Sequence, residues 1–122
     1  SERDWQIKRN GQWGKGKSFP TFGPIGPWLV TSDELPDPQT IPLELKVNGE
    51  VKQSSNTSDM IFSVAEVLSY LSQFMTLLPG DLVITGTPAG VGLGMKPPQF
   101  VKSGDLMELS AGVLGTQSQR VR

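Results

Sequence analysis

Two glycine-rich stretches of the 122-residue sequence carry residue types that bind phosphate groups. In the first, the G-x-x-x-x-G-K-[ST] spacing of a nucleotide-binding loop is formed by Gly11, Gly16, Lys17 and Ser18. Such a loop binds phosphate only where a strand leads into it and a helix N-terminus follows it. Pro20 comes almost at once, and Gly and Pro recur as far as Pro27. We therefore exclude nucleotide binding and expect an ordered, functional loop over residues 10–27, without regular helix.

The second stretch, from Thr85 to Gly92, has the T-G-x-x-x-G-x-G pattern of dinucleotide-binding dehydrogenases. That motif needs a following helix to hold the pyrophosphate, and Pro97-Pro98 prevents one. About thirty residues also remain after it, which is too few for the rest of a dinucleotide fold. The stretch stays a candidate anion site, because hydroxyl and backbone N–H groups in a Gly-rich turn can surround a carboxylate.

Two residue types that are absent from the sequence further limit the kinds of catalysis it can support. The sequence has no Cys and no His, so it offers no disulfide, no thiol nucleophile, no imidazole base and no imidazole metal ligand. Catalysis by these residues must rest on Lys, Arg, carboxylates, amides and hydroxyls. Eleven basic and twelve acidic residues leave a net charge of −1, so we expect no nucleic-acid partner.

Length and composition predict one small domain made of loops and short strands. The 122 residues suffice for a single core, and 14 Gly plus 10 Pro disfavour long helices. The longest mostly apolar stretch, Met60–Leu78, is interrupted by Ser, Glu and Gln, so we expect no membrane partner. Together with the absence of Cys and of a signal peptide, this predicts a cytoplasmic protein.

Alternating apolar residues predict a hairpin and further strands. Ile41–Val47 alternates and is followed by Asn48-Gly49 and a second strand at 50–53, which predicts a type I′ turn. The other predicted strands are Trp28–Thr31, Leu82–Thr85, Leu106–Ser110 and a final one within Val113–Arg122. Two Gly-Asp-Leu turns, at Asp81 and Asp105, are each expected to lead into a strand.

One helix is predicted, over residues 64–75. Ser63 and Glu66 form an S-x-x-E capping box, and an apolar stripe at helical spacing follows, ending before Pro79-Gly80. Several short strands around one main helix predict a β-rich α+β fold.

The sequence resembles the fumarylacetoacetate hydrolase family in five consecutive blocks. These blocks are SERDWQ, GQWGKGKSFPTFGPIGPWLVT, DMIFSVAEVLSYLSQFMTLLPGD, LVITGTPAGVG and VKSGDLMEL. The resemblance implies that residues 1–122 are a single C-terminal fragment of the family's catalytic domain, a mixed β-sandwich roll. Within the family, the residues of SERDWQ and GKGKSFPTFGPIGPWLVT are most similar to the subgroup of acylpyruvate and sugar-acid hydrolases. This subgroup also includes ureidoglycolate lyases and hydroxyheptadienedioate isomerases.

The resemblance implies a hydrolase that cleaves a C–C bond in acylpyruvate-like or 2,4-diketo acids with the help of Mg²⁺ or Mn²⁺. The metal would act as a Lewis acid on the developing enolate. Its ligands in the family lie upstream of Ser1, so no metal ligand is expected in this chain. Two alternatives stay open: an isomerase, decarboxylase or lyase that uses the same enolate chemistry, and a catalytically inactive fragment.

Five residues match the family's functional positions. Arg3 and Gln6 match residues that face the site, and Lys17 matches a lysine that stabilises the developing oxyanion. Thr87, with Gly86 beside it, matches the turn that receives the substrate carboxylate. Lys15 is the natural control for Lys17, because we expect it to be solvated. The implied partners are a small 2-keto or diketo acid substrate and a second copy of the protein in a homodimer.

Overall fold

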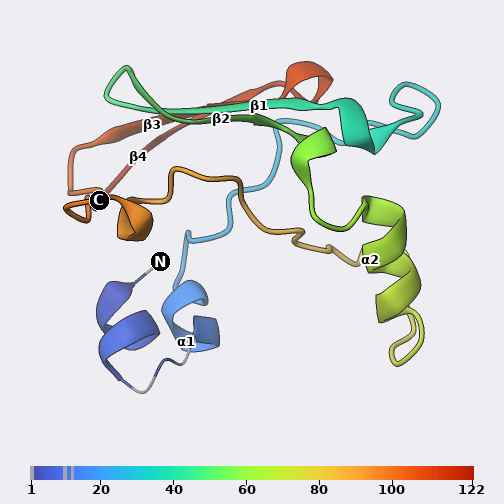
Figure 1. Cartoon of the computed structure of the whole chain (residues 1–122), viewed down its shortest axis with the longest axis horizontal. Coiled ribbons are helices and arrows are strands. Elements are labelled where there is room, and N and C mark those ends of the chain that lie inside the picture. Colours follow the sequence, from blue (N-terminus) through green and yellow to red (C-terminus); the bar gives the residue numbers. More distant parts are fainter. Residues whose placement is uncertain (1, 10, 12) are drawn as a thin grey trace.

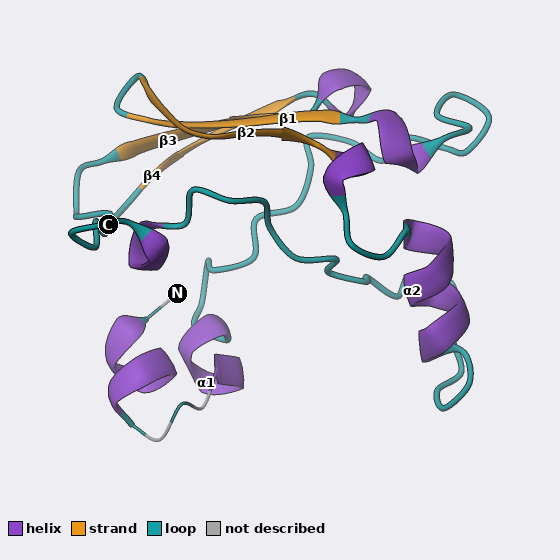
Figure 2. Cartoon of the chain, in the orientation of Figure 1, coloured by secondary structure: helices purple, strands orange, loops and turns teal. Residues whose placement is uncertain are grey.

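The main layer of the molecule is an antiparallel sheet of four strands. The computed structural model describes residues 2–9, 11 and 13–122. The strands lie in the order β2-β1-β3-β4 and comprise Pro42–Val47 (β1), Glu50–Asn56 (β2), Leu106–Ser110 (β3) and Thr116–Arg120 (β4). Figure 1 shows α2 below one end of this sheet and the N-terminal helices below the other. Helices are few and short, and loops join them, so the predicted β-rich α+β class is confirmed (Figure 2).

The predicted hairpin is confirmed. β1 pairs with β2 along its whole length, and φ is 51° at Asn48 and 81° at Gly49. Positive values at both central residues are those of a type I′ turn. The Asn48 amide also donates to Asp105 Oδ1 and accepts from the Leu106 N–H, both at 2.9 Å. The turn is therefore fixed to the start of β3.

The two Gly-Asp-Leu turns have the same local geometry, but different secondary structure follows them. Asp81 Oδ2 accepts from the Leu78 N–H at 2.8 Å, and Asp105 Oδ2 accepts from the Lys102 N–H at 2.7 Å. Only the turn at Asp105 leads into a strand, the predicted Leu106–Ser110. The predicted final strand is also present, as β4, after Gly115 with φ 86°.

Two predicted strands are wrong. Leu82–Thr85 and Trp28–Thr31 form no ladder with any other described segment. A strand needs a neighbour for its backbone hydrogen bonds, and apolar β-branched residues alone do not supply one. Ile84 is 93% exposed, and Trp28 uses its indole N–H to bond the Val113 carbonyl at 3.2 Å.

The predicted helix is present but shorter than expected: α2 spans Val64–Leu71. The capping box is confirmed, since Ser63 Oγ accepts from the Glu66 N–H at 3.2 Å and the Ser63 N–H donates to Glu66 Oε2 at 2.7 Å. Residues 73 and 74 bond carbonyls three residues back, which tightens the chain into turns after Leu71. The end at residue 75 was therefore wrong by one turn.

The expectation of no helix in residues 10–27 is also wrong. Trp13–Lys17 forms a single helical turn, α1, while Asn10 and Gln12 lie outside the described residues. The first proline comes only at Pro20, so α1 keeps its backbone donors. A π-helical turn, Asp4–Lys8, precedes it, with the Arg9 N–H bonded to the Asp4 carbonyl at 3.1 Å.

Few apolar side chains are buried. In the described part of the chain the buried hydrophobic residues are Ile41 and Ala111, each 7% exposed, which precede β1 and follow β3. Large apolar side chains elsewhere face solvent, for example Ile61 at 92%. Among the helices described, none has the length and hydropathy needed to cross a bilayer.

Candidate active site

The π-helical turn and α1 meet at a contact that only glycine allows. The Glu2 N–H donates to the Gly16 carbonyl at 2.7 Å. A Cβ on Gly16 would lie 2.7 Å from the Cβ of Gln6 and 2.9 Å from its backbone nitrogen, closer than real Cβ contacts. Gln6 is buried there, with 9% exposure. The predicted site residues Gln6 and Lys17 therefore stand on two adjoining helical segments.

Arg3 reaches a distant part of the sequence. Its guanidinium carbon lies 4.2 Å from the centroid of the Phe100 ring, within the range of a cation–π contact. The Arg3 side chain is exposed. This contact joins the N-terminal helical pair to the segment that follows the second Gly-rich stretch.

Lys17 and its control Lys15 have similar surroundings. Both are exposed. The Lys17 ammonium lies 5.5 Å from the centroid of the Trp13 ring, and the Lys15 ammonium lies 5.7 Å from that of Trp5. Exposure agrees with the expectation for Lys15 and does not separate the two lysines. The catalytic role of Lys17 stays a prediction from the resemblance.

Thr87 is an exposed residue of the irregular segment 85–90, called the Thr87 turn below, and one side chain of β2 holds this segment in place. Gln53 Nε2 lies 2.9 Å from Thr87 Oγ1, 2.9 Å from the Pro88 carbonyl and 3.2 Å from the Ala89 carbonyl. The amide of Gln53 thus fixes three consecutive residues of the turn.

Gly86 and Gly90, on either side of Thr87, differ in how much space surrounds them. Gly86 and Gly90 both have φ of 102°, where a side chain is strained. A Cβ on Gly90 would lie 2.0 Å from the Lys52 carbonyl, whereas a Cβ on Gly86 would meet nothing within 4 Å. Gly90 is where the turn packs on β2, and Gly86 leaves open space beside Thr87.

A second side chain of β2 holds the C-terminal end of the segment that runs from Thr85 to Phe100. Lys52 Nζ lies 3.2 Å from Gln99 Oε1, and the Gln99 N–H donates to the Gly92 carbonyl at 2.9 Å. Since Phe100 follows Gln99 and lies against Arg3, a continuous series of contacts connects Arg3 with the Thr87 turn. In Figure 1 this segment and the N-terminal helices lie on the same side of the sheet. Among the described residues no hydrogen bond joins Lys17 to Thr87.

The acidic groups near Arg3 serve the local backbone. The Glu2 carboxylate accepts from the N–H groups of Asp4 and Trp5, at 3.2 and 2.8 Å. Asp4 pairs with Lys8 at 2.9 Å, and the hydrogen bond and charge of Lys8 lower the pKa of Asp4. The described residues contain no group of three or more Asp or Glu that could hold a metal ion. The residues present therefore do not fit a metal site by themselves.

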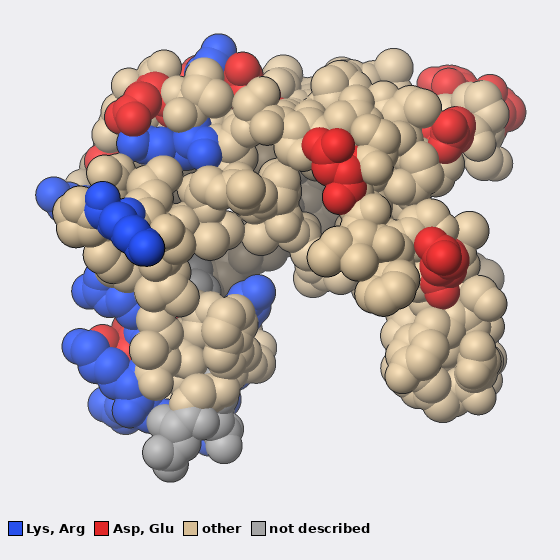
Figure 3. Space-filling model, in the orientation of Figure 1, with Lys and Arg blue, Asp and Glu red and all other residues tan. Residues whose placement is uncertain are grey.

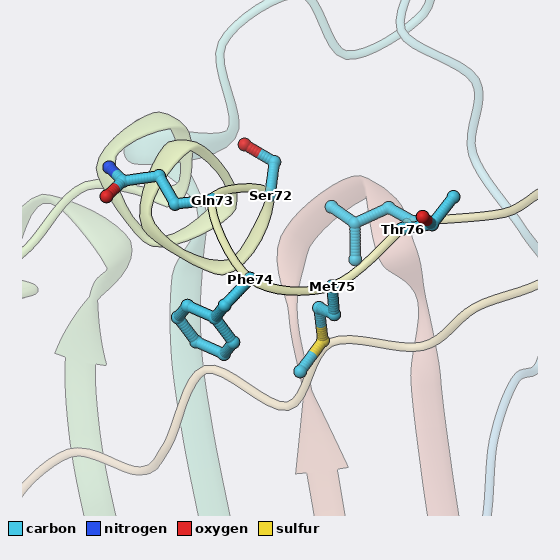
Figure 4. Close-up of a pocket in the computed structure, with 6 residues that line it drawn as sticks. Ser72, Gln73, Phe74, Met75 and Thr76 are labelled. Atoms are coloured by element: carbon cyan, nitrogen blue, oxygen red, sulfur yellow. The ribbon is translucent and has the colours of Figure 1, made fainter.

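A depression of about 550 Å³ lies away from these residues. It is lined by the turn after α2, Ser72–Leu77, where Phe74 and Met75 point away from Ser72 (Figure 4). None of the predicted site residues lines it. No charged side chain lines this depression.

Positive charge gathers on the half of the molecule that carries the N-terminal helices. Five of the eleven Lys and Arg residues fall within the first 17 residues: Arg3, Lys8, Arg9, Lys15 and Lys17. Figure 3 shows the basic side chains over that half, with some acidic ones among them, and only acidic side chains toward the α2 end. An anionic ligand would be drawn toward the basic half.

Sequence reasoning missed Gln53, Lys52 and Phe100. Gln53 and Lys52 follow each other on one strand, and strict alternation would place their side chains on opposite faces. Phe100 comes after two prolines in a stretch without periodicity. No signal in the sequence alone connects these residues to Arg3 or Thr87.

Comparisons with known proteins match the whole chain to one family. The family model for the fumarylacetoacetate (FAA) hydrolase C-terminal part matches residues 1–122. A Burkholderia lata protein, provisionally named a hydrolase, is 57% identical over 123 residues, covering 100% of this chain and 44% of its own length. The chain thus spans less than half the length of the curated relatives it matches.

Two solved structures have the same fold over this region. The fumarylacetoacetate hydrolase of Exiguobacterium antarcticum superposes with a TM-score of 0.93 at 43% identity, covering 98% of this chain and 43% of that one. The 2-hydroxyhepta-2,4-diene-1,7-dioate isomerase of Mycobacterium marinum has a TM-score of 0.82 at 44% identity, with coverage of 98% and 43%. With a family model that matches every residue of the sequence, this chain belongs to the fumarylacetoacetate hydrolase family.

Proposed function

We propose that residues 1–122 form one wall of the active site of an enzyme that hydrolyses a C–C bond in acylpyruvate-like or 2,4-diketo acids. The observation that carries the proposal is the family match over the whole chain. The geometry is compatible with it, because the segment that follows Thr85 and the N-terminal helices lie on one side of the sheet, and Arg3 contacts Phe100 of that segment.

In this proposal the chain's own residues bind and stabilise anions. Hydrolysis of an acylpyruvate adds water across a C–C bond and releases a carboxylate and pyruvate, with negative charge developing on an enolate oxygen. Thr87 and the backbone beside Gly86 receive the substrate carboxylate. Lys17 stabilises the developing oxyanion, and Arg3 and Gln6 border the same pocket.

The proposal places the Mg²⁺ or Mn²⁺ ligands and the acid–base groups outside residues 1–122. The described residues offer no cluster of three carboxylates, and the sequence has no His. We derive no catalytic step through the metal from this chain. The proposal also includes a homodimer, and sedimentation of the full-length protein tests it. By full-length protein we mean the natural polypeptide that contains residues 1–122.

An isomerase is the second candidate, because a relative of that name is 44% identical and has the same fold over this region. The experiment that decides is a product assay of the full-length protein with Mn²⁺. Release of pyruvate from acetylpyruvate supports the hydrolase. Conversion of a 2-hydroxy-2,4-dienedioate to an isomer without cleavage supports the isomerase. Failure of both reactions with metal-loaded full-length protein would contradict the proposal.

A further inference from the structure

The contacts of Gln53 settle which end of its amide faces the Thr87 turn. Two of the three atoms around this end are backbone carbonyl oxygens, at 2.9 Å from Pro88 and 3.2 Å from Ala89. A carbonyl oxygen only accepts hydrogen bonds, so the amide must present its NH₂ group there, and the flipped orientation would oppose oxygen to oxygen.

The same orientation sets the role of the Thr87 hydroxyl. Because Gln53 Nε2 only donates, Thr87 Oγ1 must accept at their 2.9 Å contact. The hydroxyl hydrogen of Thr87 then points elsewhere, and among the described residues no acceptor is found for it. Thr87 is left as a donor with its oxygen already fixed.

A β-bulge brings the supporting side chains to this place. In the β1–β2 ladder Leu45 pairs with Gln53 and Lys46 pairs with Val51, so Lys52 is an extra residue on β2. A bulge breaks the alternation of side chains and can re-aim them, and bulges often occur beside active sites. Here Gln53 bonds the 87–89 turn and Lys52 bonds Gln99, so consecutive residues hold the same Gly-rich segment.

We infer that Gln53 is a positioning residue that keeps the Thr87 hydroxyl oriented to donate to a carboxylate oxygen of the substrate. This inference rests on the proposed function, since it takes Thr87 to contact that carboxylate. It adds a residue outside the five that the resemblance assigned. The role requires a side-chain NH₂ group at position 53, because both backbone carbonyls and the Thr87 oxygen accept from its two N–H hydrogens, one of which is shared between two of these acceptors.

The test measures oxalate binding in the presence of Mn²⁺, and KM and kcat for acetylpyruvate, in the full-length protein. The variants are Gln53→Leu, the isosteric Gln53→Glu, Thr87→Val and the Gln53→Leu/Thr87→Val pair. Gln73→Glu is the control, because Gln73 is exposed on the turn after α2. Thermal unfolding of each variant verifies that it is folded.

We expect both Gln53 variants to raise KM and the oxalate Kd about tenfold, with kcat changed much less, since a hydrogen bond to a charged group is lost. The double variant should be no weaker than Thr87→Val, because Gln53 acts through Thr87. Gln73→Glu should bind oxalate like the wild type.

Three results would overturn parts of this account, and they differ. Unchanged oxalate binding in Gln53→Leu and Gln53→Glu, or fully additive effects in the double variant, would reject the positioning role alone. An unchanged KM in Thr87→Val would reject the proposed substrate contact itself. Absence of oxalate binding by the wild-type protein would reject the proposed function and this inference together.

Discussion

Lys17 and Lys15 stand two residues apart on α1, each exposed and each beside a Trp ring. The proposed function separates them, since only Lys17 stabilises the developing oxyanion. We predict that Lys17→Met in the full-length protein lowers kcat roughly 100-fold or more, the loss typical of one oxyanion donor. Lys15→Met should leave kcat nearly unchanged. Steady-state kinetics of the two variants test this, and equal losses would contradict the role of Lys17.

The candidate site residues differ in how far the sequence alone could identify them. Lys17, Thr87 and Arg3 fall within blocks that resemble the family. The resemblance therefore identified these residues as candidates, but it did not predict which residues they contact. Gln53 was not predictable, because its position depends on a bulge that the alternating pattern of a strand does not reveal. The contact of Phe100 with Arg3 was not predictable either, because only the folded chain brings the two residues together.

At the scale of elements, local signals were reliable where the element satisfies its own hydrogen bonds or carries its own turn. The hairpin with Asn48-Gly49 and the cap of α2 at Ser63 are of this kind, and both were predicted. Leu82–Thr85 has strand-forming residues but no neighbouring strand to pair with. α1 was missed because Gly14 and Gly16 were taken as helix breakers, although Gly16 is needed for close packing.

The packing of α1 on the π-helical turn gives a second prediction. Gly16→Ala should destabilise the full-length protein by about 1–3 kcal/mol, because its Cβ would lie 2.7 Å from the Cβ of Gln6. Gly14→Ala is the matched control on the same helical turn, with nothing within 4 Å of the added Cβ. It should change stability by less than about 1 kcal/mol, toward greater stability. Urea unfolding measures both, and a neutral Gly16→Ala would show that the two segments do not pack as described.

The turn before β3 gives a prediction about pH. The hydrogen bond from Asn48, and then that from the Lys102 N–H, lower the pKa of Asp105. A carboxyl whose pKa is lowered by folding stabilises the native state above its unfolded pKa, and this stabilisation is lost as pH falls through the folded value. Stability should therefore decrease below about pH 4. Asp105→Asn should flatten that decrease in urea unfolding measured from pH 6 to pH 3.

Glu108→Gln is the control for this prediction, because Glu108 is an exposed carboxylate on β3 itself. It should leave the acid side of the stability profile as in the wild type. An unchanged profile in Asp105→Asn would mean that the turn does not stabilise the fold through this carboxylate.

At the scale of the whole molecule, two features agree with the proposal that further polypeptide completes the active site. The relatives it matches are more than twice as long, and large apolar side chains such as Ile84 and Ile61 face solvent in the described structure. Isolated exposed apolar residues are common, but in the described residues they outnumber the buried hydrophobic residues, which are Ile41 and Ala111. Under the proposed function, the basic half around the N-terminal helices faces an anionic substrate.

The most direct measurement is a crystal structure of the full-length protein with Mn²⁺ and oxalate. The account predicts that the Thr87 hydroxyl donates to an oxalate oxygen, that the Lys17 ammonium lies at the same pocket, and that every protein ligand of the metal comes from outside residues 1–122. A metal ligand from within this chain, or oxalate bound on a surface that neither Thr87 nor Lys17 reaches, would contradict it.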